Sequence, residues 1–551
     1  MKTMKKMLTL VLALLMVVSL ALPAMAADTY TIKIEGSKSN TNAESAKGHT
    51  YEAYQILTGT MSDAGLNLGN PEWGANVNVA TFLPALKADT YYGTGTENIF
   101  SAVTTAKEFA AVVAASTFTV AQLEHLAGLL HQHLQGTPVD VSEETAPPYK
   151  LEVEAGYYLI KDKDNSLTGL DKDYTDIILH ISQDVTVYHK GSVPTVEKTV
   201  SEANSAYYES IEMAMQREYY YKLVGTLPSD FEDYTEYEYN FVDTMSAGIT
   251  FVDADPSKAG DQLVSAIAVY SSTSTEETLV QDAGYTVEVV KNADNTTTLK
   301  VKFADLKHDA LHPFQPGDKI IIIYKAKLNE NAVVGGKGND NTAYLEYSNN
   351  PNGEGTGKTS SDGGKVYTYG INLTKVDGKT PDTKLEGVKF ILYREILQSG
   401  GTYIYKYAKV NASGAVTEWA DNEADATVLT TDANGQITIK GLDSGVIYSL
   451  KETSTLDGYN QILDPINIHL TAEKTGDVVT RVWMEDNTHV TDIASYVVGS
   501  DVVGVQFNVP NYMGDVLPST GGVGTTIFYI LGAIMALGAT LLLITKKRVS
   551  A

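Results

Sequence analysis

The sequence predicts a chain built mainly of β-strands, arranged as several β-sandwich domains in series. Short stretches of alternating apolar and polar residues recur between turn-forming clusters throughout its middle. Tyrosine is abundant, with 34 residues against 12 Phe and 3 Trp, and such a composition favours strands. At 551 residues the chain has room for about three domains. Many short strands with few helices are typical of immunoglobulin-like sandwiches.

The first 26 residues have the pattern of a cleaved secretory signal peptide. Lysines near the start are followed by the apolar stretch Leu8–Leu22 and by small residues ahead of the expected cleavage after Ala26. A first transmembrane helix is the alternative. With the signal peptide removed, the rest of the chain is expected outside the cytoplasm.

The other end, residues 515–551, has the pattern of a membrane-retained tail. The stretch Thr526–Ile544 is apolar and about long enough to span a bilayer as one helix. Three basic residues at 546–548 follow it, which places that end in the cytoplasm. The region between the two ends therefore lies on the outer side of the membrane.

Between these ends we expect three regions. Residues 27–191 combine strand-like stretches such as "TYTIKIEG" with a helical insertion, "TVAQLEHLAGLLHQHL", whose leucines recur at helical spacing. After the linker "GSVPT", residues 192–370 carry almost only strand patterns, such as "DKIIIIYKAKL". Residues 371–514 repeat this style. Each region is expected to form a β-sandwich domain.

Composition narrows the function further. The net charge of −27 argues against nucleic acid as the main partner, because nucleic acid is bound through basic patches. The absence of cysteine excludes disulfides, thiolate nucleophiles and Cys-ligated zinc. Neither a metal nor a cofactor is expected. His125 and His133 share one helix face without a third ligand, and "NGEGTGKTSS" lacks the first glycine of a P-loop.

The tail carries "LPSTG" directly before its apolar stretch. Leu517, Pro518, Ser519, Thr520 and Gly521, followed by the apolar and basic segments, resemble the sorting signal read by sortases. The resemblance implies cleavage between Thr520 and Gly521 by a cysteine transpeptidase and transfer of the Thr520 carboxyl to an amine. The protein would then be attached covalently to peptidoglycan after transient retention in the membrane. A plain membrane anchor is the alternative.

A second motif, "VTVYHK", ends at Lys190. It resembles the pilin motif of the backbone subunits of Gram-positive pili, which ends in Val-x-Val-Tyr-Pro-Lys. His189 stands where that motif has proline, and Ile181 stands where it has tryptophan. The resemblance implies that the Lys190 amine receives the Thr520 carboxyl of the next subunit. A solvated surface lysine is the alternative.

The third region contains "YSLKETSTLDGY", which resembles the E-box of collagen-adhesin B-type domains. That resemblance implies an internal isopeptide bond between Lys375 and Asn511, with Glu452 as the catalytic acid and Asn508 as a rival to Asn511. Burial would disfavour the charged lysine and keep the acid protonated. A simple Lys–Glu ion pair is the alternative.

The second region resembles the related A-type domain. Here the resemblance implies a bond between Lys198 and Asn341 with Asp243 as the acid, and Asn349 is the rival asparagine. An ordinary β-domain without a crosslink is the alternative. We place no such set of residues in the first region.

Taken over the whole chain, these motifs resemble the major, backbone subunit of a sortase-assembled Gram-positive pilus. The resemblance implies a structural protein and no enzyme in turnover: identical subunits would join head to tail, a contact that does not close and so makes a fibre. Sortase and peptidoglycan are further expected partners. Accessory pilins and a host-surface ligand are compatible with this resemblance as additional partners. The alternative is a wall-anchored adhesin or a minor tip or basal pilin.

Overall fold

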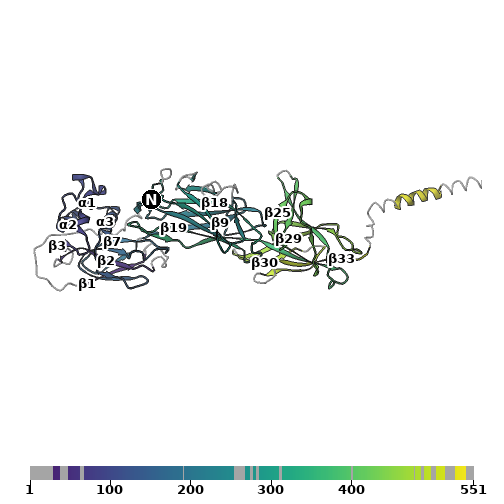
Figure 1. Cartoon of the computed structure of the whole chain (residues 1–551), viewed down its shortest axis with the longest axis horizontal. Coiled ribbons are helices and arrows are strands. Elements are labelled where there is room, and N and C mark those ends of the chain that lie inside the picture. Colours follow the sequence, from purple (N-terminus) through teal and green to yellow (C-terminus); the bar gives the residue numbers. More distant parts are fainter. Residues whose placement is uncertain are drawn as a thin grey trace, which may run out of the picture. The chain divides into compact units, whose positions relative to one another are not determined.

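The computed structural model confirms a mainly β chain with helices inserted near its N-terminus (Figure 1). It describes residues 29–36, 47–61, 68–189, 191–252, 267–272, 277–280, 284–308, 313–398, 401–476, 478–485, 489–497, 504–514 and 528–540. The signal peptide, Lys190 and the pentapeptide Leu517–Gly521 lie outside the described residues. The chain divides into two compact units, one comprising Met1–Ile211, Glu218–Lys327 and Asn339–Val366, the other Glu212–Arg217, Leu328–Gly338 and Tyr367–Ala551.

The N-terminal part of the first unit is a sandwich of two sheets. One has the order β5–β1–β8, and the other has the order β3–β2–β6–β7 with β4 paired to β2. A buried cluster that includes Ile34, Leu151 and Ile160 draws side chains from both sheets. The strands are β1 (Thr29–Glu35), β2 (Tyr51–Met61), β3 (Leu68–Trp73), β4 (Asp140–Val141), β5 (Tyr149–Glu154), β6 (Gly156–Asp162), β7 (Asp176–Ile181) and β8 (Val185–Tyr188).

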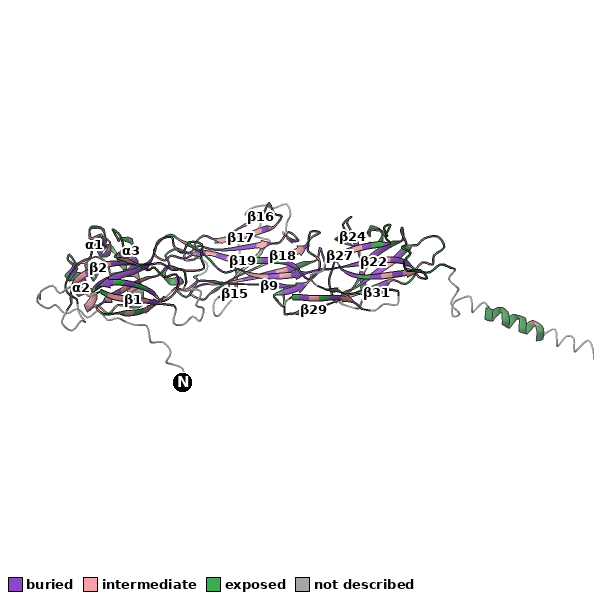
Figure 2. Ribbon diagram, turned by 90° about the horizontal axis from the view of Figure 1, so that it is seen from below, coloured by how far each residue is buried: buried purple, intermediate pink, exposed green. Residues whose placement is uncertain are grey.

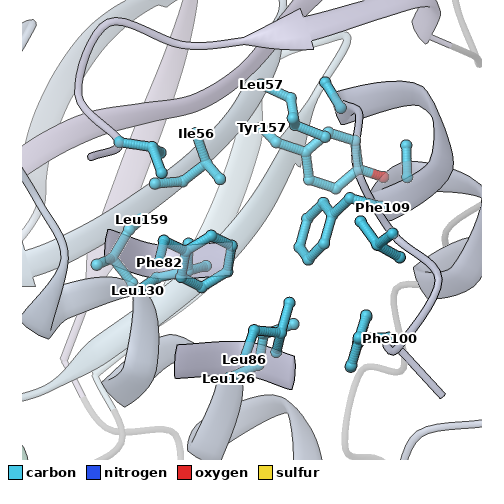
Figure 3. Packing of buried hydrophobic residues seen from close by; sticks show 14 of the residues in the cluster. Ile56, Leu57, Phe82, Leu86, Phe100, Phe109, Leu126, Leu130, Tyr157 and Leu159 are labelled. Carbon is cyan, nitrogen blue, oxygen red and sulfur yellow. The ribbon is translucent and has the colours of Figure 1, made fainter. Parts of the chain in front are cut away.

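Helices cover the other face of the β2-containing sheet (Figure 1). They are α1 (Val79–Ala88), α2 (Ala106–Ala115) and α3 (Val120–Gln132), with 3₁₀ turns η1 (Thr90–Tyr92) and η2 (Gly95–Glu97) between the first two. The predicted helical insertion corresponds to α3, whereas α1 and α2 were not predicted. Figure 3 shows Phe82 and Phe109 from these helices packed near Ile56 and Leu57 of β2.

One asparagine holds the C-terminal end of α1. Asn98 is buried, and its Nδ2 donates to the carbonyls of Leu86, Lys87 and Asp89 at 3.1, 3.3 and 2.8 Å. Its Oδ1 accepts the Phe100 N–H at 2.8 Å. The side chain thus satisfies carbonyls that the end of a helix leaves unpaired.

We expect Asn98→Ala to lower the free energy of unfolding of this part by about 2–3 kcal/mol, because several buried polar groups lose their partner. Chemical denaturation followed by far-UV circular dichroism would measure the loss. Asn78→Ala is the matched control. Asn78 lies at the other end of α1 and makes no capping hydrogen bond with its side chain, so that change should cost less than about 0.5 kcal/mol.

The remainder of the first unit is a second sandwich. Its larger sheet has the order β10–β21–β19–β12–β17–β16 with β20 on β19, and its partner has the order β15–β14–β18–β11–β9 with β13 on β18. The strands are β9 (Thr195–Ser201), β10 (Ser210–Glu212), β11 (Glu218–Thr226), β12 (Tyr239–Met245), β13 (Ile249–Phe251), β14 (Ile267–Ser272), β15 (Glu277–Val280), β16 (Thr286–Lys291), β17 (Thr297–Phe303), β18 (Lys319–Leu328), β19 (Asn339–Ser348), β20 (Thr356–Lys358) and β21 (Asp362–Tyr367), with a 3₁₀ turn η3 (Phe231–Asp233).

Buried and more exposed residues alternate along β19 and along β18 from Ile322 onward (Figure 2). This is the pattern of strands with one face against a core. Tyrosines fill much of that core: Tyr219, Tyr221, Tyr239, Tyr324 and Tyr347 are at most 1% exposed. The high tyrosine content of the sequence is therefore explained in part by interior packing.

The second unit contains two further sheets. One has the order β27–β22–β33–β31, and the other has the order β25–β24–β23–β28–β29–β30–β32 with β26 on β23. The strands are β22 (Tyr369–Asp377), β23 (Lys389–Leu397), β24 (Tyr403–Val410), β25 (Val416–Ala420), β26 (Leu429–Thr430), β27 (Gln436–Leu442), β28 (Ile447–Ser454), β29 (Ile466–Thr475), β30 (Val478–Met484), β31 (Thr491–Ala494), β32 (Tyr496–Val497) and β33 (Val505–Asn511), with a 3₁₀ turn η5 (Glu423–Asp425).

Strands β22 and β33 run parallel and adjacent, with Asp377 opposite Asn511. Of the predicted membrane span Thr526–Ile544, the structure describes residues 528–540, which are helical. Within the described part of the chain, no helix is both long and apolar enough to cross a membrane.

Candidate functional site

The first candidate site lies inside the second sandwich of the first unit. Lys198 comes from β9 and Asp243 from β12, so the two side chains meet across the two sheets, and the Lys198 ammonium nitrogen donates to Oδ2 of Asp243. Asn341 comes from β19, where it pairs with Met245 of β12. All three side chains are buried, with at most 1% exposure. The three predicted residues therefore lie together in one buried site.

A tyrosine that sequence reasoning missed joins these three residues. The Tyr324 hydroxyl donates to Oδ2 of Asp243 at 2.8 Å and accepts from Nδ2 of Asn341 at 2.7 Å. The Lys198 nitrogen lies 3.3 Å from the same hydroxyl. Tyr324 lies on β18, in the run "KIIIIYKAKL", where it is the one aromatic residue among aliphatic neighbours. This contrast with its neighbours was the one feature of the sequence that could have drawn attention to Tyr324.

Burial decides the charge states here. It lowers the pKa of Lys198 and raises the pKa of Asp243, against the attraction of each residue for its partner. Both shifts favour a neutral amine beside a neutral acid. Oδ1 of Asn341 is buried without a hydrogen-bond partner among the described residues. The carboxamide carbonyl is thus unblocked, next to a potential nucleophile and a potential proton donor.

The rival Asn349 lies elsewhere. It is buried, but its Nδ2 donates to the carbonyls of Leu167 and Lys172 at 3.3 and 2.9 Å, both in the N-terminal part of the chain. The structure therefore groups Asn341, and not Asn349, with Lys198 and Asp243.

The second candidate site lies in the second unit. The Lys375 nitrogen from β22 lies 2.5 Å from Oδ1 of Asn511 on β33 and 3.0 Å from Oε2 of Glu452 on β28. Nδ2 of Asn511 donates to Oε1 of Glu452 at 2.9 Å. The three side chains are at most 2% exposed. Lys375 and Asn511 lie close because β22 and β33 are neighbours in one sheet.

Burial lowers the pKa of Lys375 to about 8, although the nearby Glu452 carboxylate opposes that shift. The amine is therefore more easily deprotonated than a solvated lysine. Thr455 stands where the E-box has alanine, and its Oγ1 accepts from Nδ2 of Asn511 at 2.8 Å. This departure from the motif supplies a further contact to the asparagine. The rival Asn508 instead donates to Asp492 at 2.8 Å.

No comparable set occurs among the described residues of the N-terminal sandwich. The one fully buried lysine described there is Lys161, which lies 3.3 Å from Glu52 and 2.6 Å from Asp164. An asparagine is not among these contacts.

The segment that leads to Lys190 is fixed in place. Strand β8 ends at Tyr188, and the buried His189 donates its backbone N–H to the carbonyl of Glu35 at 3.0 Å. On the far side of Lys190, the Ser192 N–H donates to Oδ2 of Asp173 at 2.6 Å. The predicted acceptor lysine therefore lies between two anchored residues in the chain.

Comparison with known proteins supplies the family context. Residues 369–484 match the SpaA prealbumin-like fold domain, and residues 510–550 match the LPXTG cell wall anchor motif. The chain is 28% identical over 365 residues to the trypsin-resistant surface T6 protein of Streptococcus pyogenes serotype M6. The alignment with the T6 protein covers 60% of this chain and 64% of the T6 protein.

Two solved structures are also similar to this chain. The T6 backbone pilin of serotype M6 Streptococcus pyogenes has a TM-score of 0.49 and 17% identity, with 90% of this chain and 100% of that chain covered. The full-length major pilin SpaD from Corynebacterium diphtheriae has a TM-score of 0.46 and 16% identity, with 89% and 98% covered.

The anchor match confirms the predicted localisation of the protein. It is a surface protein attached covalently to the cell wall. The predicted sorting pentapeptide, Leu517–Gly521, falls within the matched residues 510–550.

Proposed function

We propose that the protein is the structural backbone subunit of a covalent cell-surface pilus. The observation that carries this proposal is the relation to the T6 protein, because a solved T6 structure is described as a backbone pilin. The cell wall anchor match supports the same role. Identical subunits would be joined head to tail, and the base of the pilus would be joined to peptidoglycan.

In the proposed polymerisation, sortase acts on the bond between Thr520 and Gly521. A cysteine thiolate attacks the Thr520 carbonyl, and the amine of Gly521 leaves with the C-terminal segment. The Lys190 amine of another subunit then attacks the thioester. An amide forms between Thr520 and Lys190, and the thiolate is released. The position of Lys190 in the sequence supports this role, because it directly follows a described strand and its neighbours His189 and Ser192 both donate backbone hydrogen bonds to the N-terminal sandwich.

A stepwise ladder of polymers in cell-wall extracts tests the proposal. An immunoblot of wild-type extract should show bands at multiples of the subunit mass, and deletion of the sortase should leave the monomer. A wild type that gives only one wall-linked band would overturn the backbone role and favour the alternative, a wall-anchored adhesin or a minor tip or basal pilin.

We also propose that each candidate site forms an isopeptide bond in a single event. The neighbouring carboxylate takes one proton from the lysine ammonium, and the neutral amine attacks Cγ of the asparagine. The C–N bond to the lysine forms, and the C–N bond to the asparagine nitrogen breaks. A second proton passes from the attacking amine through the acid to the leaving nitrogen, which departs as ammonia. Close contact in a dry site supports a reaction without an enzyme, because the groups are already positioned.

The contacts of Tyr324 lead to a prediction. Tyr324→Phe should slow formation of the Lys198–Asn341 bond, because the hydroxyl that contacts all three reacting groups is lost. Intact mass spectrometry of chain purified soon after expression should then show a fraction heavier by one ammonia. Tyr239→Phe is the matched control, since the Tyr239 hydroxyl is buried and has no hydrogen-bond partner among the residues that the structure describes. Equal masses for both variants would contradict the role of Tyr324.

The lowered pKa of Lys375 leads to a pH prediction for Asn511→Ala, in which the amine stays free. The folded pKa is about 8 against an ordinary 10.5, so between these values the unfolded chain binds more protons. The free energy of unfolding should therefore rise across this window by about 3 kcal/mol. Below pH 8 the lysine is protonated in both states, so it should not change the free energy of unfolding with pH.

Chemical denaturation from pH 8 to 10.5 would measure this rise. The matched control is the double variant Lys375→Met, Asn511→Ala, which lacks both the crosslink and the amine but keeps every tyrosine. The same pH dependence in both variants would show that Lys375 does not titrate abnormally.

A further inference from the structure

A separate cluster of buried ionisable side chains lies in the N-terminal sandwich. His49, Asp162 and His189 are at most 6% exposed. Each offers one metal-ligating atom, and these three atoms all lie within 4.8 Å of one another. None of the three residues belongs to either crosslinking site.

The cluster joins the two sheets of this sandwich. His49 lies two residues before β2, and Asp162 ends β6, which pairs with β2 at Tyr51. His189 follows β8, which belongs to the other sheet. Nδ1 of His49 lies 2.8 Å from Oδ1 of Asp162, and the rings of His49 and His189 are 4.5 Å apart.

Outer contacts orient the cluster as they do in metal sites. Nε2 of His189 lies 3.6 Å from Oδ1 of Asp173, and Oδ2 of Asp162 accepts the Thr175 N–H at 3.0 Å. A carboxylate behind a histidine and a hydrogen bond to the distal carboxylate oxygen both fix the ligands of known metal sites. The Tyr51 hydroxyl, 3.0 Å from Nδ1 of His189, adds a neutral oxygen beside the cluster.

We propose that His49, Asp162 and His189 bind one Zn²⁺ ion. Two imidazoles and one carboxylate are ligands that zinc accepts in a tetrahedral site, with water or the Tyr51 hydroxyl as the fourth. Calcium and magnesium prefer all-oxygen sites. The negative charges of Asp162 and Asp173, each beside one of the two histidines, would balance the charge of the ion.

Zinc binding requires the ligand atoms to adjust. In a tetrahedral site, ligand atoms about 2 Å from the metal lie about 3.3 Å apart. The wider separations, which reach up to 4.8 Å, must therefore shorten, and the 2.8 Å between Nδ1 of His49 and Oδ1 of Asp162 must lengthen. The ion would link β2 and β6 to the segment after β8. It would thereby tie together the sandwich in which the described residues include no lysine–acid–asparagine set.

Zinc titration of the mature ectodomain, residues 27–514, tests the proposal. This chain contains every strand that the structure describes. After removal of metal with a chelator, Zn²⁺ alone is added in competition with a chromophoric chelator, and metal content is measured after dialysis. We expect one zinc per chain, loss of binding in His49→Ala and His189→Ala, and affinity 10–100-fold weaker in Asp173→Asn.

His125→Ala is the matched control. His125 also pairs with a carboxylate, Asp89 at 2.7 Å, in the same sandwich but outside the cluster, so this variant should bind zinc as the wild type does. Thermal unfolding adds a second readout: at zinc one hundred times the Kd, the unfolding equilibrium constant should fall about 100-fold in the wild type and in His125→Ala.

The same zinc addition should leave the unfolding of His49→Ala unchanged. If His49→Ala does not fold, His189→Asn can replace it and should also lose zinc binding. The absorption spectrum of Co²⁺ bound to the wild type is a further measurement, because it reports tetrahedral coordination by nitrogen and oxygen ligands. Less than one zinc per wild-type chain, or equal binding by the wild type and the His49 and His189 variants, would overturn the proposal. The cluster would then be a proton-bridged network only.

Discussion

Lys190→Ala is expected to abolish the polymer ladder and to leave a single wall-linked band. The variant removes the proposed acceptor amine but keeps the sorting signal, so sortase can still transfer Thr520 to the cell wall. Immunoblots of wall extracts would show the change. Lys190→Arg should behave in the same way, because a guanidinium keeps the charge but is not a nucleophile at neutral pH.

Two further variants separate this result from general damage. Lys163→Ala removes another lysine of the N-terminal sandwich, one with an exposed side chain, and should leave the ladder intact. Thr520→Ala should abolish both the ladder and the wall-linked band, since it changes the sorting pentapeptide at the residue whose carbonyl the sortase is proposed to attack. A ladder that persists in Lys190→Ala would refute the role of Lys190 and direct attention to another amine.

The second large effect is expected from Asn511→Ala. The intact mass of the wild-type ectodomain should be lower than the calculated mass by one ammonia for each proposed bond. In Asn511→Ala one of these bonds cannot form, so the deficit should be smaller by one ammonia. Lys375 and Asn511 are 136 residues apart, so a crosslink between them restricts the unfolded chain by about 5 kcal/mol. We expect the Tm of the second unit to fall by about 15 °C.

Asn508→Ala is the matched control for this result. Asn508 lies on the same strand but contacts Asp492, so the ammonia loss should persist and the Tm should change by only a few degrees. In the first unit, Asn341→Ala and Asn349→Ala form a corresponding pair, in which only the former should lose its ammonia step. A wild-type mass equal to the calculated value would remove both proposed bonds.

The sequence allowed much of the fold to be predicted, because alternation of apolar and polar residues marks strands with one buried face. It did not reveal α1 and α2. These helices have ten residues each, and α1 contains Pro84, so neither gives a long helical pattern. Their packing on the sheet, through residues such as Phe82 and Phe109, stabilises them in place of local propensity.

The candidate sites show a similar division. Motifs indicated Lys375, Glu452 and two asparagines of β33, but the choice between Asn508 and Asn511 depends on register. Residues three apart on a strand point to opposite faces, and Asn511, unlike Asn508, shares the buried face of β33 with its apolar residues. The sequence marks Tyr324 only as an aromatic residue in an aliphatic run. Its place beside Asp243 could not be predicted, because it depends on how two separate sheets face each other.

The parallel pairing of β22 and β33 has a mechanical consequence. Force that pulls on the two ends of this strand pair enters at the start of β22 and leaves at the end of β33, so it acts along the strands. The hydrogen bonds between them then bear load together, in shear, instead of breaking one after another. With the proposed Lys375–Asn511 bond in place, tension would pass from β22 directly into the end of β33. The residues between Lys375 and Asn511 would then carry almost none of it, and a stretched pilus would not lengthen by unravelling this unit.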